Sequence, residues 1–270
     1  MSRYARPMTN PPSRTARDTH YANLRRAYRD KHASANNEPL RLYGLHTVAA
    51  AIANPRRGIT KLLVTRNALQ RLEVKRDDLE PEIVEPKVLD QLVGADAVHQ
   101  GIVAEVDPLP ELRLDALPEC NLVLVLDQVT DPHNIGAVLR SAVAMAAGAV
   151  IMTARHAPAE SMVLAKAASG ALEHVPVIRV RNLADALGTL HEQGFTTVGL
   201  DSDGEHDLRA SMAGDRIALV LGAEGKGLRQ RTRDTVNALA RIDLPGPIRS
   251  LNVSNAAVLS LYIARQHLDG

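Results

Sequence analysis

Two stretches in the last third of the 270-residue chain, one rich in glycine and one with a Pro-Gly-Pro loop, decide how its fold is interpreted. The first is IALVLGAEGKGL, residues 217–228, an apolar run that ends at Gly222 and continues into a glycine-rich loop around Glu224. The second is IDLPGPIRSLNVSN, residues 242–255, a short apolar strand, a Pro/Gly loop and a polar cluster that opens an apolar helix. Glycine lets backbone groups approach a ligand closely, and loops after the strands of open α/β sheets are where ligands bind. Each stretch taken alone is equally consistent with an ordinary turn.

Two nucleotide-binding motifs are absent. The segment Gly225-Lys226-Gly227 has the composition of a phosphate loop, but the spacing G-x-x-x-x-G-K-[ST] is missing. No G-x-G-x-x-G follows a first strand, which argues against a dinucleotide-binding enzyme. The glycines therefore point to some other ligand.

Strands alternate with helices from residue 121 onward, which predicts a parallel sheet covered on both faces. The continuous apolar run 122–126 is typical of a strand buried on both sides, and residues 127–136 read as a polar loop. The predicted strands are 122–126, 149–152, 175–180, 196–200, 217–221 and 240–244, and the predicted helices are 137–147, 161–168, 183–193, 228–235 and 252–268.

A smaller α/β unit precedes this sheet. Its predicted helices are 45–53, 67–74 and 88–93, the last led by Pro86, and its predicted strands are 61–65, 82–84 and 101–106. Residues 107–120 contain three prolines and read as a linker. We therefore expect four parts: a basic, disordered tail (1–38), an N-terminal domain (39–106), the linker (107–120) and a second domain (121–270).

Composition narrows the class of protein. The tail carries eight Lys and Arg against three Asp and Glu, and the remainder carries 24 against 28. Such a tail binds a polyanion such as RNA or is simply solvated. No apolar run approaches the ~20 residues of a membrane span, the single Cys120 suits a reducing cytoplasm, and no Cys/His cluster has metal-ligand spacing. We expect a cytoplasmic protein without a metal.

The predicted loops after three strands carry the candidate site residues. These residues are Asn134, Arg140, Glu224, Ser250 and Asn252. Asn134 and Arg140 are about 240° apart on a helix, so for both to reach one site Asn134 must lie in the loop or at the helix cap. No nucleophile–base pair is evident, and an arginine with amides suits a phosphate-bearing substrate. The alternative is that Arg140 is a surface charge and Glu224 a carboxylate at a helix start.

The three segments together resemble the motifs of the SpoU (TrmH-like) branch of the SPOUT RNA methyltransferases. The matching residues are DPHNIGAVLR (131–140), LGAEGKG (221–227) and IDLPGPIRSLNVSNA (242–256), with ASGA (168–171) and Val175-Pro176 between them. Upstream, YGLHTV (43–48) and HQG (99–101) resemble the substrate domain of ribosomal-RNA guanosine 2′-O-methyltransferases. The resemblance covers about residues 39–268.

The resemblance implies a fold, a cofactor and partners. A C-terminal trefoil knot would bind S-adenosylmethionine through backbone groups at Gly222, Ile242 and Leu251. The N-terminal domain would resemble RNA-binding ribosomal proteins and present the RNA, and the protein would be a homodimer with its site near the dimer interface. The expected fold class is therefore α/β, a knotted parallel sheet preceded by a small RNA-binding domain.

The implied reaction moves a methyl group to a ribose 2′-hydroxyl, most simply of a guanosine in 23S ribosomal RNA. Because arginine stays protonated, we favour Arg140 as a phosphate holder that stabilises the developing alkoxide over Arg140 as a base. Asn134 and Ser250 would orient the ribose, Glu224 would order either the motif loops or Asn134, and Asn252 would position the loop and helix start. The alternatives are a transfer-RNA substrate and a non-catalytic ribosome-assembly factor, the latter expected to show broken motifs.

Overall fold

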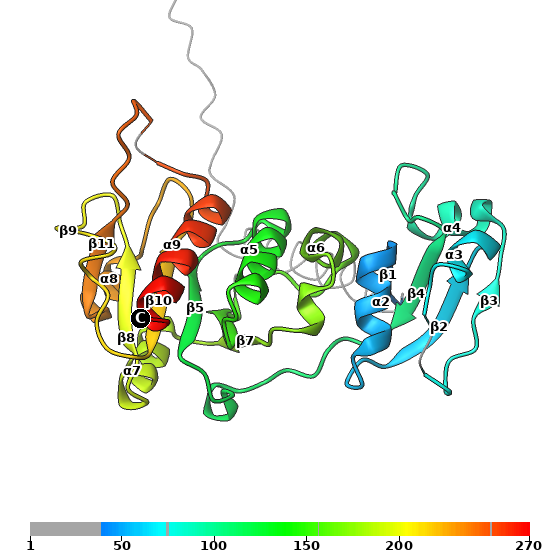
Figure 1. Cartoon of the computed structure of the whole chain (residues 1–270), viewed down its shortest axis with the longest axis horizontal. Coiled ribbons are helices and arrows are strands. Elements are labelled where there is room, and N and C mark those ends of the chain that lie inside the picture. The colour runs from blue at the N-terminus through cyan, green and yellow to red at the C-terminus, as the bar shows by residue number, and fades with distance from the viewer. Residues whose placement is uncertain (1–38, 74–75, 156, 249) are drawn as a thin grey trace, which may run out of the picture. The chain divides into compact units, whose positions relative to one another are not determined.

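A computed structural model describes residues 39–73, 76–155, 157–248 and 250–270. The predicted basic tail, 1–38, lies outside the described residues, as does Val74 at the end of one predicted helix. Leu40–Gly270 form one unit that contains two sheets (Figure 1). None of the helices in these ranges is long and apolar enough to cross a membrane.

The larger sheet has seven strands, and each of its pairings is parallel, which confirms the predicted parallel sheet. Its order is β7-β6-β5-β10-β8-β11-β9. The strands are β5 (Leu122–Asp127), β6 (Ala149–Thr153), β7 (Val177–Val180), β8 (Thr196–Leu200), β9 (His206–Asp207), β10 (Ile217–Gly222) and β11 (Ala238–Arg241). The helices between and after them are α5 (Pro132–Ala144), α6 (Met162–Ala168), α7 (Leu183–Glu192), α8 (Gln230–Thr235) and α9 (Val253–Leu268), with the 3-10 turns η1 (Leu114–Ala116) and η2 (Ala171–Glu173).

The central strands bury both faces of this sheet. Every residue of β5 is buried, and alternate residues enter different cores because side chains alternate along a strand. Leu124 packs in the core that also contains Leu139 of α5 and Leu261 of α9, whereas Val125 packs in the core that contains Leu187 of α7. Figure 1 shows α5 (green) and α9 (red) beside each other. The unbroken apolar run at 122–126 is the sequence signature of this two-sided burial.

The smaller sheet has the order β1-β4-β2-β3 and is mixed. Its elements are β1 (Leu40–Tyr43), α2 (Leu45–Ala53), β2 (Ile59–Val64), α3 (Arg66–Leu69), β3 (Glu82–Ile83), α4 (Pro86–Val93) and β4 (Ile102–Val106). Helix α2 has the predicted bounds, and the strand β1 is an element the sequence pattern did not predict. Leu89 of α4 covers one face of the sheet, while the other face belongs to the core shared with α6.

Two boundaries near the predicted loops were wrong. Residues 127–136 are not all loop, because α5 begins at Pro132 and ends at Ala144 rather than spanning 137–147. Asp131 caps this helix by accepting a hydrogen bond from the N–H of His133 at 3.1 Å, and proline favours the first helical position. The last strand is Ala238–Arg241 rather than 240–244, because its pairings with β8 and β9 end at Arg241.

Candidate functional site

The carboxyl ends of the central strands bring the predicted loops to one edge of the large sheet. In the parallel pairing of β5 with β10, Asp127 lies opposite Gly222, where both strands end. Strand β8 lies between β10 and β11, so the loops after these four strands are neighbours. This is the edge at which open α/β sheets bind ligands.

Asn252 joins residues from all three predicted motifs. Its Nδ2 donates hydrogen bonds to Oδ1 of Asn134 at 3.1 Å and to Oε2 of Glu224 at 3.2 Å. Its Oδ1 caps α9, accepting from the backbone N–H of Ser254 at 2.9 Å and from the Ser254 hydroxyl at 2.6 Å. Both amide hydrogens and the carbonyl oxygen of Asn252 are therefore used, which fixes the orientation of the side chain.

If Asn134 and Arg140 were to reach one site, their spacing in the sequence required Asn134 to lie in the loop or at the helix cap, and the structure places it in neither position. It is the third residue of α5, inside its first turn, and Asp131 is the cap. Its Oδ1 is held by Asn252, and among the described residues its Nδ2 donates no hydrogen bond. The two N–H groups of this amide are therefore available to an oxygen of a substrate.

Arg140 stands apart from this group. It lies on α5 six residues after Asn134, its side chain is exposed, and no described residue forms a hydrogen bond or ion pair with it. The structure thus brings Asn134, Glu224 and Asn252 together within one chain and leaves the Arg140 guanidinium available.

A cavity of about 520 Å³ lies between the loops. It is lined by all three predicted cofactor-binding residues, Gly222, Ile242 and Leu251, together with Glu224 and Ser250. The other lining residues are Leu200, Asp201, Ser202, Asp203, Leu221, Ala223, Gly225, Lys226, Gly227, Arg233, Ala240, Leu244, Val253 and Ala256. Its size falls within the 300–1,000 Å³ typical of small-molecule sites.

The glycines of the second motif have a steric reason. The loop folds back after β10, so that the N–H of Gly227 donates to the carbonyl of Ala223 at 2.9 Å. A Cβ on Gly222 would overlap the backbone of Gly227, and Gly227 itself has a φ of 63°. Only glycine at position 222 lets the two backbone segments pack this closely.

Two acidic residues at this edge were not predicted. Asp127 is fully buried and accepts hydrogen bonds from the N–H and Nε of Arg229, at 3.0 and 2.7 Å, and from the Thr232 hydroxyl at 2.7 Å. Asp201, directly after β8, forms an ion pair with Arg233, and both residues line the cavity. Each lies where a parallel strand ends, and that position is the signal by which the sequence could have revealed them.

The fold and the site together define a class: a parallel α/β protein that binds a small ligand among the loops at the carboxyl edge of its sheet. The sequence model of the "SpoU rRNA Methylase family" matches residues 121–262, and that for "RNA 2′-O ribose methyltransferase substrate binding" matches residues 41–112. The chain belongs to the SpoU rRNA methylase family and is an S-adenosylmethionine-dependent methyltransferase.

Named relatives agree with this assignment. The 23S rRNA (guanosine-2′-O-)-methyltransferase RlmB of Vibrio parahaemolyticus is 37% identical over 84% of this chain and 97% of its own length. The enzyme of the same name from Escherichia coli is 37% identical over 83% of this chain and 96% of its own length. The crystal structure of an AdoMet-bound rRNA methyltransferase from Sinorhizobium meliloti is similar with a TM-score of 0.73, at 25% identity over 88% of this chain and 91% of that chain.

Proposed function

We propose that this enzyme methylates the ribose 2′-hydroxyl of a guanosine in 23S ribosomal RNA. The observation that carries the proposal is the Asn134–Glu224–Asn252 group beside the cavity, formed by three motifs far apart in the sequence. Relatives that share more than a third of their residues with this chain over most of its length carry this activity in their names. Intact motif residues argue against a non-catalytic assembly factor.

The cavity residues fit the cofactor. S-adenosylmethionine supplies a methyl group on a sulfonium that is already a good electrophile. The carboxylates of Asp203 and Glu224 at the cavity suit the positive charges of this molecule, whereas Asp201 is already paired with Arg233, and Ile242 and Leu251 offer apolar surface. We assign Gly222, Ile242 and Leu251 to cofactor binding, mainly through backbone groups exposed by the glycine- and proline-rich loops.

The protein's part in the chemistry is to bind and orient the ribose and to stabilise the charge that forms on its oxygen. Arg140 has no partner among the described residues, so its guanidinium can hold a phosphate by two N–H groups and face a developing alkoxide. The Asn134 amide and the Ser250 hydroxyl orient the ribose. The hydrogen bond between Glu224 and Asn252 holds the loops that carry them next to each other.

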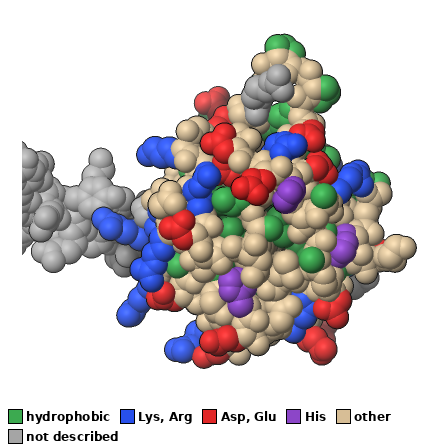
Figure 2. Space-filling view, turned by 90° about the vertical axis from the view of Figure 1, so that its left-hand side faces the viewer, with side chains coloured by type: hydrophobic (Ala, Val, Ile, Leu, Met, Phe, Trp, Pro, Cys, Tyr) green, Lys and Arg blue, Asp and Glu red, His purple; other side chains and the backbone are tan. Residues whose placement is uncertain are grey.

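A C-terminal trefoil knot and a homodimer complete the proposal. The position of β8 between β10 and β11, and the packing of α9 against both α5 and β10, support a knotted C-terminal segment. Ile248, Val258 and Tyr262 are exposed by 72%, 39% and 47%, and the last two lie one turn apart on α9. Figure 2 shows hydrophobic side chains at the tip of the projecting loop. A second subunit would cover these apolar residues and could bring a further surface to Arg140.

The small sheet presents the RNA in this account. Figure 2 shows acidic and basic side chains mixed on the end of the molecule that carries β9 and β11. The charges on that face therefore do not favour binding of RNA. The match of residues 41–112 to a substrate-binding domain supports an RNA contact on the N-terminal part instead. The basic tail, 1–38, is a second candidate contact, tested by the loss of low-salt RNA binding when it is deleted.

The test is methyl transfer from labelled S-adenosylmethionine to unmodified 23S ribosomal RNA and, separately, to unmodified transfer RNA. We expect label in the ribosomal RNA alone, with Arg140→Ala as the inactive control. Label confined to transfer RNA would overturn the substrate and keep the reaction. Absence of label in naked RNA and in isolated large-subunit precursors, with the cofactor bound, would overturn the proposed activity.

A further inference from the structure

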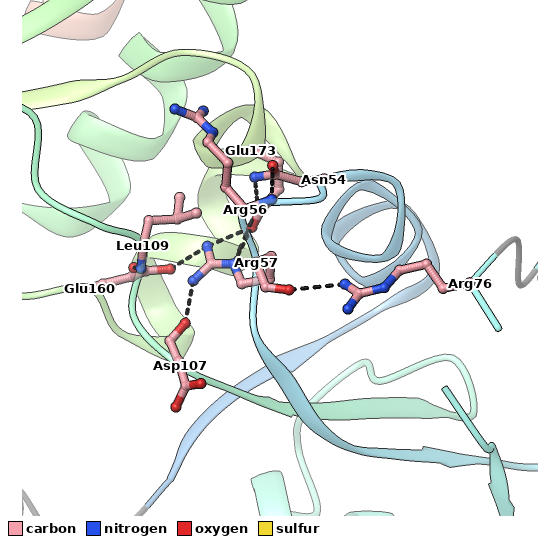
Figure 3. A network of polar contacts seen from close by, with 8 residues as sticks. All are labelled: Asn54, Arg56, Arg57, Arg76, Asp107, Leu109, Glu160 and Glu173. Carbon is pink, nitrogen blue, oxygen red and sulfur yellow. Dashed lines mark hydrogen bonds and ion pairs between the residues drawn. The ribbon is translucent and has the colours of Figure 1, made fainter. Parts of the chain in front are cut away.

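Arg57 is the largest side chain that is fully buried in the described part of the chain, and the reaction as described does not use it. Its Nε and Nη2 donate to the Glu173 carboxylate at 3.0 and 2.5 Å, and its Nη2 also donates to Oε1 of Glu160 at 2.6 Å. Its Nη1 donates to the carbonyl of Asp107 at 2.9 Å. The side chains of Glu173 and Glu160 are only 2% and 12% exposed. Figure 3 shows the guanidinium enclosed by these groups.

The partners of Arg57 come from three parts of the chain. Arg57 follows α2 and precedes β2 of the small sheet, Asp107 begins the linker, and the two glutamates flank α6 of the large-sheet part. Neighbouring groups complete the cluster: Nδ2 of Asn54 donates to Glu173 at 2.7 Å, and the N–H of Leu109 donates to Glu160 at 3.1 Å. Nε and Nη2 of Arg57 therefore join the RNA-binding part, which carries the small sheet, to the methyltransferase part, which carries the large sheet, while Nη1 binds the start of the linker.

Burial alone would lower the pKa of Arg57, but the hydrogen bonds to Glu173 and Glu160 outweigh it, and the pKa is raised. The guanidinium thus stays charged between its two carboxylates. A buried ion pair of this kind contributes little net stability compared with apolar packing, and its best-attested role is to specify one arrangement of the elements it joins. The geometry of the cluster would be lost if the two parts shifted relative to each other.

A second contact joins the same surfaces. Lys166 of α6 donates from Nζ to the carbonyl of Val98 at 2.8 Å and lies over the ring of Tyr43, 5.0 Å from its centroid. Gln100 belongs to the same corner, where its Oε1 accepts from the N–H of Leu45 at 2.9 Å. The motifs 43–48 and 99–101 thus shape the surface that receives α6.

Helix α6 in turn lies against the helix that carries the site. A Cβ on Gly136 of α5 would overlap Ala167 of α6, so the two helices pack here at backbone distance. Gly136 is two residues from Asn134 and four from Arg140. The position of α6 therefore relates the RNA-binding part directly to the residues proposed to hold the ribose.

We propose that Arg57 is a positioning residue for methyl transfer: by clamping Glu160 and Glu173 on either side of α6, it fixes the RNA-binding part relative to α5 and its site residues. This proposal rests on the proposed function, since the RNA bound by the RNA-binding part must reach the cofactor held by the methyltransferase part. Without the clamp, RNA and cofactor still bind, but the ribose is presented in a wider range of positions. A misplacement of about 1 Å can cost about 100-fold in rate.

The test compares the full-length protein with Arg57→Gln and with the double variant Arg57→Gln/Glu173→Gln, which removes the charge of the more deeply buried of the two carboxylates. We expect the single-turnover rate at saturating 23S RNA to fall by about 100-fold, with the dissociation constants for RNA and cofactor within about twofold of the parent. Arg57→Lys should recover part of the rate, because an ammonium holds one carboxylate but lacks the planar fork. The matched control is Arg113→Gln, which removes an exposed linker arginine paired with Asp115.

Hydrogen exchange of the same proteins separates this inference from the proposed function. We expect faster exchange in α2 and in the segment from α6 to η2 for the Arg57 variants and no change for Arg113→Gln. Unchanged exchange would overturn the clamp whatever RNA the enzyme methylates. A lower melting temperature with an unchanged or raised single-turnover rate would also overturn it, because Arg57 would then be structural or inhibitory. Failure of the parent to methylate 23S RNA would overturn only the proposed substrate.

Discussion

Two arginines, one in the turn between α2 and β2 and one on α5, show how differently this chain uses the same side chain. Arg57 is fully buried, and its guanidinium is hydrogen-bonded to two carboxylates and a carbonyl. Arg140 is exposed and has no partner among the described residues. An arginine whose N–H groups all donate to groups of the protein itself stabilises the folded structure. One whose N–H groups have no protein acceptor can bind a phosphate or an alkoxide. The comparison predicts that Arg140 affects catalysis with little effect on stability, whereas Arg57 affects stability and, through the position of the RNA-binding part, also the rate of methyl transfer.

The largest expected effect is on catalysis at Arg140. Arg140→Ala should lower the single-turnover methyl-transfer rate by about 10³-fold, the upper range for loss of one charge-stabilising group. Its free energy of unfolding should change by less than about 0.5 kcal/mol, as for a surface substitution. Urea denaturation and single-turnover assays measure the two quantities. Near-normal turnover of Arg140→Lys would remove the bidentate phosphate role, because lysine lacks the fork.

In contrast to the loss of Arg140, the loss of Arg57 should strongly lower the stability of the protein. Arg57→Met should lower the free energy of unfolding by about 3–5 kcal/mol, because it leaves the buried Glu173 and the mostly buried Glu160 without their cation. Replacing all three side chains, as Arg57→Met/Glu160→Gln/Glu173→Gln, should restore most of this loss. Urea denaturation followed by circular dichroism provides the measurement. A triple variant no more stable than Arg57→Met would show that the uncompensated carboxylates are not the cause.

Gly222 tests the shape of the loop that we propose binds the cofactor. Gly222→Ala should weaken cofactor binding more than tenfold, about 1.4 kcal/mol, because the added Cβ must displace the backbone of Gly227. Gly246→Ala is a matched control, since a Cβ there has no neighbour within 4 Å. Titration calorimetry with S-adenosylmethionine measures both. Equal affinity for the two variants would show that the cofactor does not depend on the folded-back loop.

Asn252 allows its capping role to be separated from its role in the site. Asn252→Asp keeps an oxygen to cap α9 but loses the Nδ2 donor to Asn134 and Glu224, whereas Asn252→Ala loses both. We expect both to lower the methyl-transfer rate, and only Asn252→Ala to lose the cap, at about 1 kcal/mol. Thermal denaturation beside the rate assay tells them apart. Normal turnover of Asn252→Asp would show that the link between the loops is not needed.

The smallest effect is expected at the exposed pair of Arg113 and Asp115. Their side chains are 85% and 65% exposed, and water and salt screen such exposed pairs, so they contribute little to stability. Arg113→Gln should therefore leave stability and turnover essentially unchanged, in contrast to Arg57→Gln. A change of more than about tenfold in rate would show that the linker takes part in the reaction in its own right.

The sequence predicted most of the large sheet because its signals are local. The apolar run at 122–126 and the glycines after 221 mark buried strands and the loops at their ends, and the structure has them there. The start of α5 was misplaced because Pro132 was read as loop, although proline after an Asp cap is a helix start. The buried roles of Asp127 and Arg57 could not be predicted, because their partners lie 102 and 116 residues away in the chain.

The most direct test of the account is the chemical position of the transferred methyl group. Full-length enzyme and S-adenosylmethionine would be incubated with unmodified 23S ribosomal RNA, and the product digested to nucleosides and analysed by mass spectrometry. The account predicts 2′-O-methylguanosine at a single site, seen also as one alkali-resistant dinucleotide, and none with Arg140→Ala. A methyl group on a base, or 2′-O-methylation that persists undiminished in Arg140→Ala, would contradict it.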